Sequence, residues 1–194
     1  FYGHSLVIDP WGDILAEGRS RGSLPVPKAH MEEAGLRVTF SAAARKGLSA
    51  SRPAAALKAL LKESEPGDYV ALLAFLPPSP AVASGMAAIR DAAGTVSECA
   101  TTSGIGPRYL HSTGQLHKGG ANNGIFVMFM ADAGTSIDVP DAEFDFGTLF
   151  HAQALGDFRS LDTHGRRAVL VHLGADARRG LERVAGWLGA KKAR

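Results

Sequence analysis

The chain lacks the features that would mark a secreted or membrane-bound protein. Cys99 is the one cysteine among 194 residues, so an internal disulfide and a metal site built from several cysteines are both excluded. This cysteine usage fits a reducing compartment. No apolar run approaches the roughly 20 residues that a membrane-spanning helix needs, and no signal peptide is visible. We therefore expect a cytoplasmic protein that has no membrane partner.

An excess of charge of one sign is also lacking. The formal net charge is +2, and charged residues make up 21% of the chain. Such a balance gives no broad field that would attract nucleic acid, so we expect no nucleic-acid partner. The hydrophobic content of 45% is typical of a globular domain, and a chain of 194 residues is long enough to bury one sizeable core.

Apolar runs that end at turn residues alternate with helix signals along most of the chain. Residues 69–76 read YVALLAFL and are followed by Pro77-Pro78, which is the pattern of a strand buried on both faces. Similar runs lie at residues 124–130 and 167–173, and a shorter one at residues 36–40. Helices are predicted around these runs, over residues 51–64, 81–93, 146–163 and 176–190. Strand, helix and strand at these spacings predict an α/β fold in which helices flank both faces of a parallel sheet.

The first part of the chain reads differently from the rest. Residues 4–17 contain two apolar-rich runs on either side of Asp9-Pro10-Trp11-Gly12, which predicts a β-hairpin. The following residues are rich in glycine, proline and charge, as in a linker. We therefore divide the chain into an N-terminal hairpin with its linker, over residues 1–23, and an α/β domain over residues 24–194.

The densest group of polar side chains lies in residues 103–130, SGIGPRYLHSTGQLHKGGANNGIFVMFM. Glycines punctuate this segment, and it runs directly into a predicted buried strand. α/β proteins place ligands at a loop or helix start beside such a strand. The segment is therefore the candidate functional site, and its polar residues are Arg108, His111, Ser112, Thr113, Gln115, His117 and Lys118.

Three kinds of chemistry compete for this segment. A metal site is disfavoured because the separation of His111 and His117 does not place both on one helix face, and no carboxylate lies between them. A serine nucleophile is disfavoured because Ser112 lacks the G-x-S-x-G elbow. A site for a polyol or sugar phosphate fits best, since hydroxyl and amide groups orient hydroxyls, basic groups bind an anion, and histidine moves protons. The alternative is that these groups only cap a helix and satisfy loop backbone.

Other residues carry weaker signals. Gly119-Gly120 and Gly124 match neither a P-loop nor a dinucleotide fingerprint, and we expect no cofactor. His151 and Gln153 lie on a predicted helix, where Gln153 could face the site or only cap the core.

Four segments, in this order, carry a family resemblance: GDYVALLAFLPP, GPRYLHSTGQLHKGGANNGIFV, FGTLFHAQALGD and GRRAVLVHLG. They closely resemble the C-terminal part of bifunctional transaldolase/glucose-6-phosphate isomerases, and the similarity covers residues 24–190. That part is a sugar-isomerase (SIS) subdomain of the phosphoglucose isomerase type. The resemblance implies a parallel sheet between helices, and interconversion of glucose 6-phosphate and fructose 6-phosphate.

The resemblance also implies roles for particular residues. In the family a histidine opens the sugar ring, and a glutamate moves a proton between C1 and C2 through an enediol that basic groups stabilise. His117 matches the ring-opening histidine, and Glu17 takes the position of the glutamate, although the family's Ser/Thr-Gly-Lys does not follow it here. Substrate binding is implied for Arg108, Ser112, Thr113, Gln115 and Lys118.

The resemblance leaves the assembly and the activity of this chain open. The family supplies its histidine across a dimer interface, which implies a homodimer. The first SIS subdomain, which grips the phosphate, and the transaldolase barrel are missing from this sequence and are alternative partners. The rival interpretation is a non-catalytic SIS module that binds a phosphosugar or mediates assembly.

A second resemblance concerns the N-terminus. Residues 1–18 resemble the β-hairpin near the C-terminal end of nitrilase-type amidohydrolases. The Glu-Lys-Cys set of that family is otherwise absent, because Cys99 lies in the SIS-like part and outside the nucleophile motif. An amidohydrolase remnant, whose thiol-dependent hydrolysis would require Cys99, is therefore the third and weakest interpretation.

Overall fold

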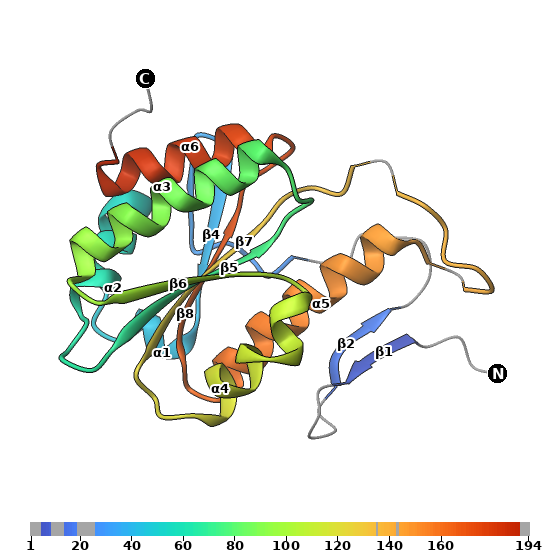
Figure 1. Cartoon of the computed structure of the whole chain (residues 1–194), viewed down its shortest axis with the longest axis horizontal. Helices are drawn as coiled ribbons and strands as arrows, with labels where there is room; N and C mark the ends of the chain where they lie inside the picture. The colour runs from blue at the N-terminus through green and yellow to red at the C-terminus, as the bar shows by residue number, and fades with distance from the viewer. Residues whose placement is uncertain (1–4, 9–13, 19–25, 135, 143, 191–194) are drawn as a thin grey trace.

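A six-stranded sheet forms the centre of the molecule (Figure 1). The computed structural model describes residues 5–8, 14–18, 26–134, 136–142 and 144–190, with side chains from residue 26 onward. The strands are β3 (Met31–Glu33), β4 (Leu36–Phe40), β5 (Tyr69–Phe75), β6 (Ala100–Ile105), β7 (Gly124–Met130) and β8 (Arg167–His172). Each long apolar run of the sequence forms one of these strands.

The strands follow one another across the sheet in the order β3-β4-β8-β7-β5-β6. Within the group β5 to β8, each strand is parallel to the strands beside it. At one side of the sheet, β3 and β4 pair with their neighbours in the antiparallel direction. From β5 the chain crosses to β6 on one side and then returns to β7 on the other. The direction of winding therefore reverses between β5 and β7, and doubly wound sheets bind ligands at the carboxyl ends of the two strands where this happens.

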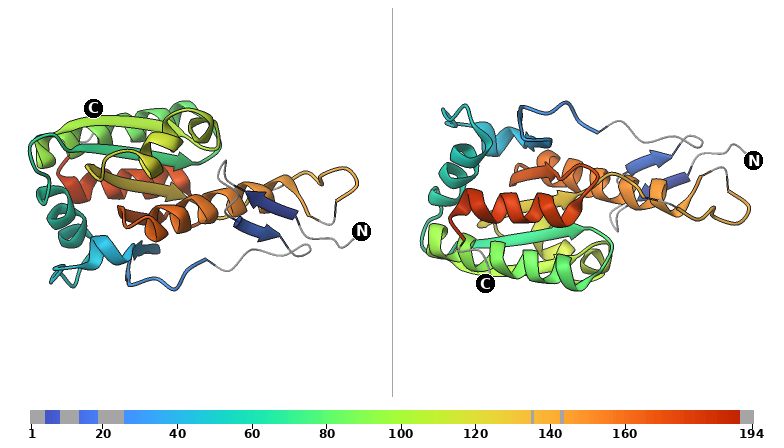
Figure 2. Two further views of the ribbon diagram at one scale, coloured as in Figure 1. Left: turned by 90° about the horizontal axis from the view of Figure 1, so that it is seen from below. Right: turned by 90° about the horizontal axis from the view of Figure 1, so that it is seen from above.

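Helices cover both faces of the sheet, which confirms the predicted fold class (Figures 1 and 2). Alternate residues of β5 point to opposite faces, because successive side chains of a strand alternate. Leu72 packs in the core beneath one layer of helices, and Leu73 in the core beneath the other. The first layer consists of α2 (Pro53–Lys62), α3 (Pro80–Ser97) and α6 (Ala177–Leu188). The second consists of the 3-10 turn η1 (Arg108–His111), α4 (Thr113–Gly119) and α5 (Phe146–Thr163), and the short helix α1 (Ala42–Arg45) follows β4.

Local sequence signals set the ends of the long helices. The side chain of Ser79 accepts a hydrogen bond from the backbone N–H of Val82 at the start of α3. The carboxylate of Asp145 accepts one from the N–H of Thr148 at the start of α5. Gly189 ends α6 in the left-handed conformation that favours glycine. Because α3 follows β5 and α5 follows β7, the amino-terminal ends of both helices lie at the carboxyl edge of the sheet.

The N-terminal strands β1 (Ser5–Ile8) and β2 (Ile14–Gly18) form the predicted antiparallel hairpin. This hairpin lies beside the amino-terminal half of α5 (Figures 1 and 2). The domain boundary predicted between residues 23 and 24 falls within residues 19–25, which lie outside the described residues. Within the described part of the chain, no helix combines the length and apolar character needed to cross a membrane.

Candidate functional site

A cavity of about 540 Å³ lies at the carboxyl ends of β5, β6 and β7, where the winding reverses. Phe75 is the last residue of β5, Pro107 follows β6, and Ala131 follows β7; all three line the cavity. The first two turns of α5 complete the wall. The cavity therefore occupies the position at which this class of sheet binds ligands.

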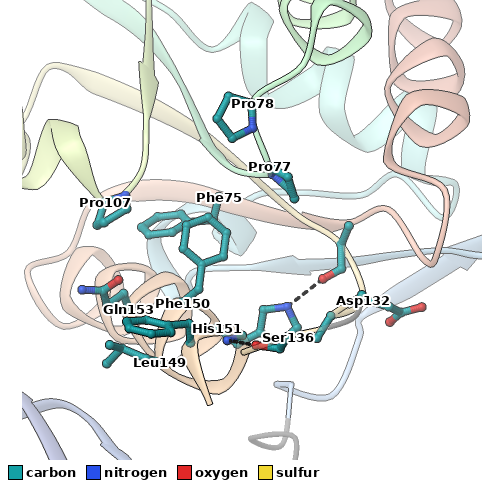
Figure 3. A pocket seen from close by; sticks show the side chains of 15 residues that line it. Phe75, Pro77, Pro78, Pro107, Asp132, Ser136, Leu149, Phe150, His151 and Gln153 are labelled. Carbon is teal, nitrogen blue, oxygen red and sulfur yellow. Dashed lines mark hydrogen bonds between the residues drawn. The ribbon is translucent and has the colours of Figure 1, made fainter. Parts of the chain in front are cut away.

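One side of the cavity is aromatic. The rings of Phe75 and Phe150 meet at 64° with 5.6 Å between their centroids, and Figure 3 shows them against each other. Phe75 also packs on Tyr109, with 5.7 Å between the ring centroids. Gly106 makes this packing possible, because a Cβ atom there would lie 2.6 Å from a carbon of the Phe75 ring. These rings offer an apolar surface for a ring-shaped ligand.

Three polar side chains of the cavity wall come from α5 and the segment before it. The Nε2 of His151 lies 2.8 Å from the carbonyl oxygen of Ala131, and Ser136 accepts a hydrogen bond from the N–H of Gly147 over 2.6 Å. The amide of Gln153 lines the cavity and has no hydrogen-bond partner among the described residues. No lysine or arginine belongs to the described lining. The cavity is therefore suited to hydroxyl groups and to an apolar ring face, while a phosphate needs cations from outside it.

Asp132 lies on the side of the cavity away from the phenylalanine rings (Figure 3), and it belongs to a charged cluster. Asp132 lines the cavity, and its Oδ1 lies 3.4 Å from Nε2 of His172 and 3.9 Å from an NH2 nitrogen of Arg37. That nitrogen is 3.1 and 3.2 Å from the two ring nitrogens of His172, so the guanidinium lies over the imidazole face. Burial, and then the charge of Arg37, lower the pKa of His172 to about 4. The imidazole is therefore neutral at pH 7, and its Nε2 faces the carboxylate of Asp132.

The structure divides the predicted site residues into two groups. Arg108, His111, Ser112, Thr113 and Gln115 have exposed side chains on η1 and the start of α4. Arg108 directly follows Pro107 of the cavity wall and is therefore the cation of this segment closest to the cavity along the chain. This exposed group is accessible to a ligand.

His117 and Lys118 form the second group, which faces the protein interior. Only 3% of His117 is exposed, and its Nδ1 lies 2.9 Å from the hydroxyl of Tyr69. Burial lowers the pKa of His117, while the nearby Asp157 opposes this shift. The Nζ of Lys118 lies 2.9 Å from Oδ1 of Asp157. Neither residue lines the cavity.

A buried network fixes this second group. The Tyr109 hydroxyl donates a hydrogen bond to Oδ2 of Asp157, and burial, with the carboxylate beside it, raises the pKa of Tyr109. Arg166 donates to the carbonyl oxygens of Lys118 and of Gly120, the latter over 2.8 Å. Through these contacts α4 is bound to Asp157 of α5 and to Arg166, the residue that precedes β8.

Glu17, the predicted proton shuttle, lies on β2, where its backbone pairs with Leu6. Its side chain lies outside the part of the chain whose side chains the structure describes. Because β2 runs beside α5, the strand of Glu17 and the helix of His151 are neighbours. The structure therefore places the hairpin beside the helix that carries His151 and Gln153.

Sequence reasoning missed the main components of the cavity. It placed His151 and Gln153 only as weak candidates, and it did not consider Asp132 or Ser136. The signal was available in the strand prediction, because residues that follow parallel strands meet at one edge of the sheet. Applied to the runs at residues 69–76 and 124–130, this rule points to residues 77–78 and 131–132, which line the cavity.

Comparisons with known proteins establish the fold alone. No protein-family model matches the chain, and no curated protein matches it. The fold is similar to that of the hypothetical protein TT0462 from Thermus thermophilus, with a TM-score of 0.55 and 17% sequence identity. The match covers 76% of this chain and 43% of that protein, so it spans less than half the length of the solved structure. Among the described residues, no group of three or more His, Cys, Asp or Glu side chains could hold a metal ion.

Proposed function

We propose that this chain is a SIS subdomain of the phosphoglucose isomerase type, and that it takes part in aldose–ketose isomerisation between glucose 6-phosphate and fructose 6-phosphate. The observation that carries the proposal is the cavity at the reversal point of the sheet, with polar and aromatic walls, beside the segment GPRYLHSTGQLHKGG. The four sequence motifs support the same family.

The chemistry of the cavity suits the sugar part of such a substrate. A sugar ring presents C–H groups on its faces, which pack on aromatic rings, and hydroxyl groups at its edge. Phe75 and Phe150 supply the aromatic surface, and Gln153 and His151 supply hydrogen-bonding groups. The positive ends of α3 and α5 lie at the same edge of the sheet, where they favour an anion.

The phosphate would bind outside the cavity. Arg108 is exposed and follows the lining residue Pro107, whereas the Lys118 ammonium is committed to Asp157. We therefore assign the phosphate contact to Arg108, with the exposed hydroxyls of Ser112 and Thr113 as further donors. A companion SIS subdomain or a second copy of the chain would supply the remaining phosphate contacts.

The proposal is tested by an assay that couples conversion of fructose 6-phosphate to reduction of NADP⁺ by glucose-6-phosphate dehydrogenase. Turnover by the wild-type chain, and a rise of its Tm with fructose 6-phosphate, are the expected results. Stabilisation without turnover would favour the rival, a non-catalytic phosphosugar-binding module. If the wild-type chain showed no turnover and no stabilisation by fructose 6-phosphate, the proposal would be contradicted.

A pair of arginine variants tests the phosphate contact. We expect Arg108→Ala to lose most of the stabilisation by fructose 6-phosphate, because a charge-assisted phosphate contact is worth about 1.5–3 kcal/mol. Arg178→Ala is the matched control, since Arg178 is an exposed arginine on α6 that pairs with Glu182 in the other helical layer. Equal stabilisation of both variants by fructose 6-phosphate would show that Arg108 does not contact the phosphate.

A further inference from the structure

We propose that His151 is the acid–base residue of the cavity and that it exchanges protons with hydroxyl groups of the sugar ring. This inference rests on the proposed function, because it names the residue that would perform part of that chemistry. It concerns a residue that the family motifs leave without a role. The cavity wall carries the evidence.

The hydrogen bond between His151 and Ala131 fixes which imidazole nitrogen carries the proton. A carbonyl oxygen can only accept, so Nε2, which lies 2.8 Å from it, must be the protonated nitrogen. In the neutral ring, Nδ1 then carries a lone pair, and it has no hydrogen-bond partner among the described residues. The same carbonyl stabilises the imidazolium that forms when Nδ1 takes up a proton. This is the arrangement that a general base requires.

The other titratable side chain of the described lining is already engaged. Asp132 faces Arg37 and His172, and in Figure 3 its carboxylate points away from the Phe75 and Phe150 rings. Gln153 and Ser136 do not titrate near neutral pH. Within the described lining, His151 is therefore the side chain that can both accept and return a proton.

His117 is less suited to this task within one chain. It is 3% exposed, and its Nδ1 is engaged by the Tyr69 hydroxyl. His151, in contrast, lines an open cavity. Substrate in the cavity therefore reaches His151 without any movement of α4.

The proposed step opens the sugar ring. Nδ1 of His151 takes the proton of the C1 hydroxyl, the bond between C1 and the ring oxygen breaks, and its electron pair stays on the ring oxygen. The imidazolium then gives the proton to that oxygen. The proton moves from one oxygen to the other, C1 becomes a carbonyl carbon, and no further reagent is consumed.

The test compares His151→Ala with His164→Ala in the coupled assay. His164 lies at the other end of α5, and its Nδ1 is 2.8 Å from the carbonyl oxygen of Ser160, so both variants lose an imidazole bound to a backbone carbonyl. We expect His151→Ala to lower kcat by at least about 100-fold, with little change in KM and with partial recovery in added imidazole. His164→Ala should keep wild-type turnover.

The outcomes separate this inference from the proposed function. If His151→Ala keeps the wild-type activity, or if His117→Ala alone abolishes it, the role of His151 is overturned. The proposed function stands in either case. Loss of kcat that imidazole does not restore, together with loss of stabilisation by fructose 6-phosphate, shows a structural role and overturns the inference as well. A wild-type chain that neither turns over nor binds fructose 6-phosphate overturns both.

Discussion

The ammonium group of Lys118 lies 2.9 Å from Oδ1 of Asp157, with 4% and 1% of the two side chains exposed. Oδ1 accepts no aligned hydrogen bond, so this contact is mainly electrostatic, while Oδ2 accepts the hydrogen bond of Tyr109. The pair joins α4 to α5 beneath the exposed group of predicted ligand contacts. Lys118 is one of the residues that the sequence suggested for substrate binding, and in the structure its ammonium group is paired with Asp157 inside the chain.

Removing one member of this pair should destabilise the fold strongly. Lys118→Met leaves a buried carboxylate without its counter-charge, and we expect a loss of about 3–5 kcal/mol in the free energy of unfolding, measured by urea denaturation. The double variant Lys118→Met/Asp157→Leu removes both charges and should recover most of this loss. As a control, Arg178→Ala removes one member of the exposed Arg178–Glu182 pair and should cost less than about 1 kcal/mol. A single variant as stable as this control would contradict the buried role of Lys118.

The sequence predicted most of the fold because buried parallel strands appear as uninterrupted apolar runs. Residues 69–76 and 167–173 could form few other structures between their turn signals, and β5 and β8 lie there. The antiparallel direction of β4 could not be predicted, because it depends on which strand β4 pairs with in space. The hydrophobic pattern predicts that β4 is buried, but it does not predict which strand pairs with β4.

The orientation of α4 shows why the site was predicted only in part. Hydrophobicity alone would place Leu116 inside and Lys118 outside, yet 59% of Leu116 is exposed and Lys118 is buried. Gly114, His117 and Lys118 share one helical face, as their spacing requires, and that face points inward. The partner that makes this possible, Asp157, lies on a distant helix. The pairing of Lys118 with Asp157 therefore outweighed the local hydrophobic pattern, and no sequence feature near α4 predicted this pairing.

His172 should make the folded chain sensitive to acid. Its pKa is lowered from 6.5 to about 4, mainly by burial, so between these values the unfolded chain binds a proton that the folded chain does not. Stability is therefore greatest above pH 6.5 and falls as the pH falls toward 4. Between pH 7 and pH 5 this group should account for up to about 2 kcal/mol, less any screening through the half-exposed Arg37 and Asp132.

Urea denaturation at pH 7 and pH 5 tests this dependence on His172. In His172→Gln the fall in the free energy of unfolding between the two pH values should be smaller than in wild type. His111→Gln, which replaces an exposed histidine, should lose as much stability as wild type over this interval. The same loss in His172→Gln and wild type would show that other groups cause the acid sensitivity.

Gly106 should control the shape of the cavity through Phe75. In Gly106→Ala the new Cβ would lie 2.6 Å from a carbon of the Phe75 ring, so the ring must leave its contacts with Phe150 and Tyr109. We expect a loss of about 1–3 kcal/mol in the free energy of unfolding, together with weaker stabilisation by fructose 6-phosphate. Gly134→Ala is the control within the same cavity wall, because its Cβ would meet no described atom within 4 Å and should change stability by less than about 0.5 kcal/mol. If both variants respond to fructose 6-phosphate as wild type does, the phosphosugar does not contact the aromatic wall, and its binding site must lie on the exposed residues of η1 and α4.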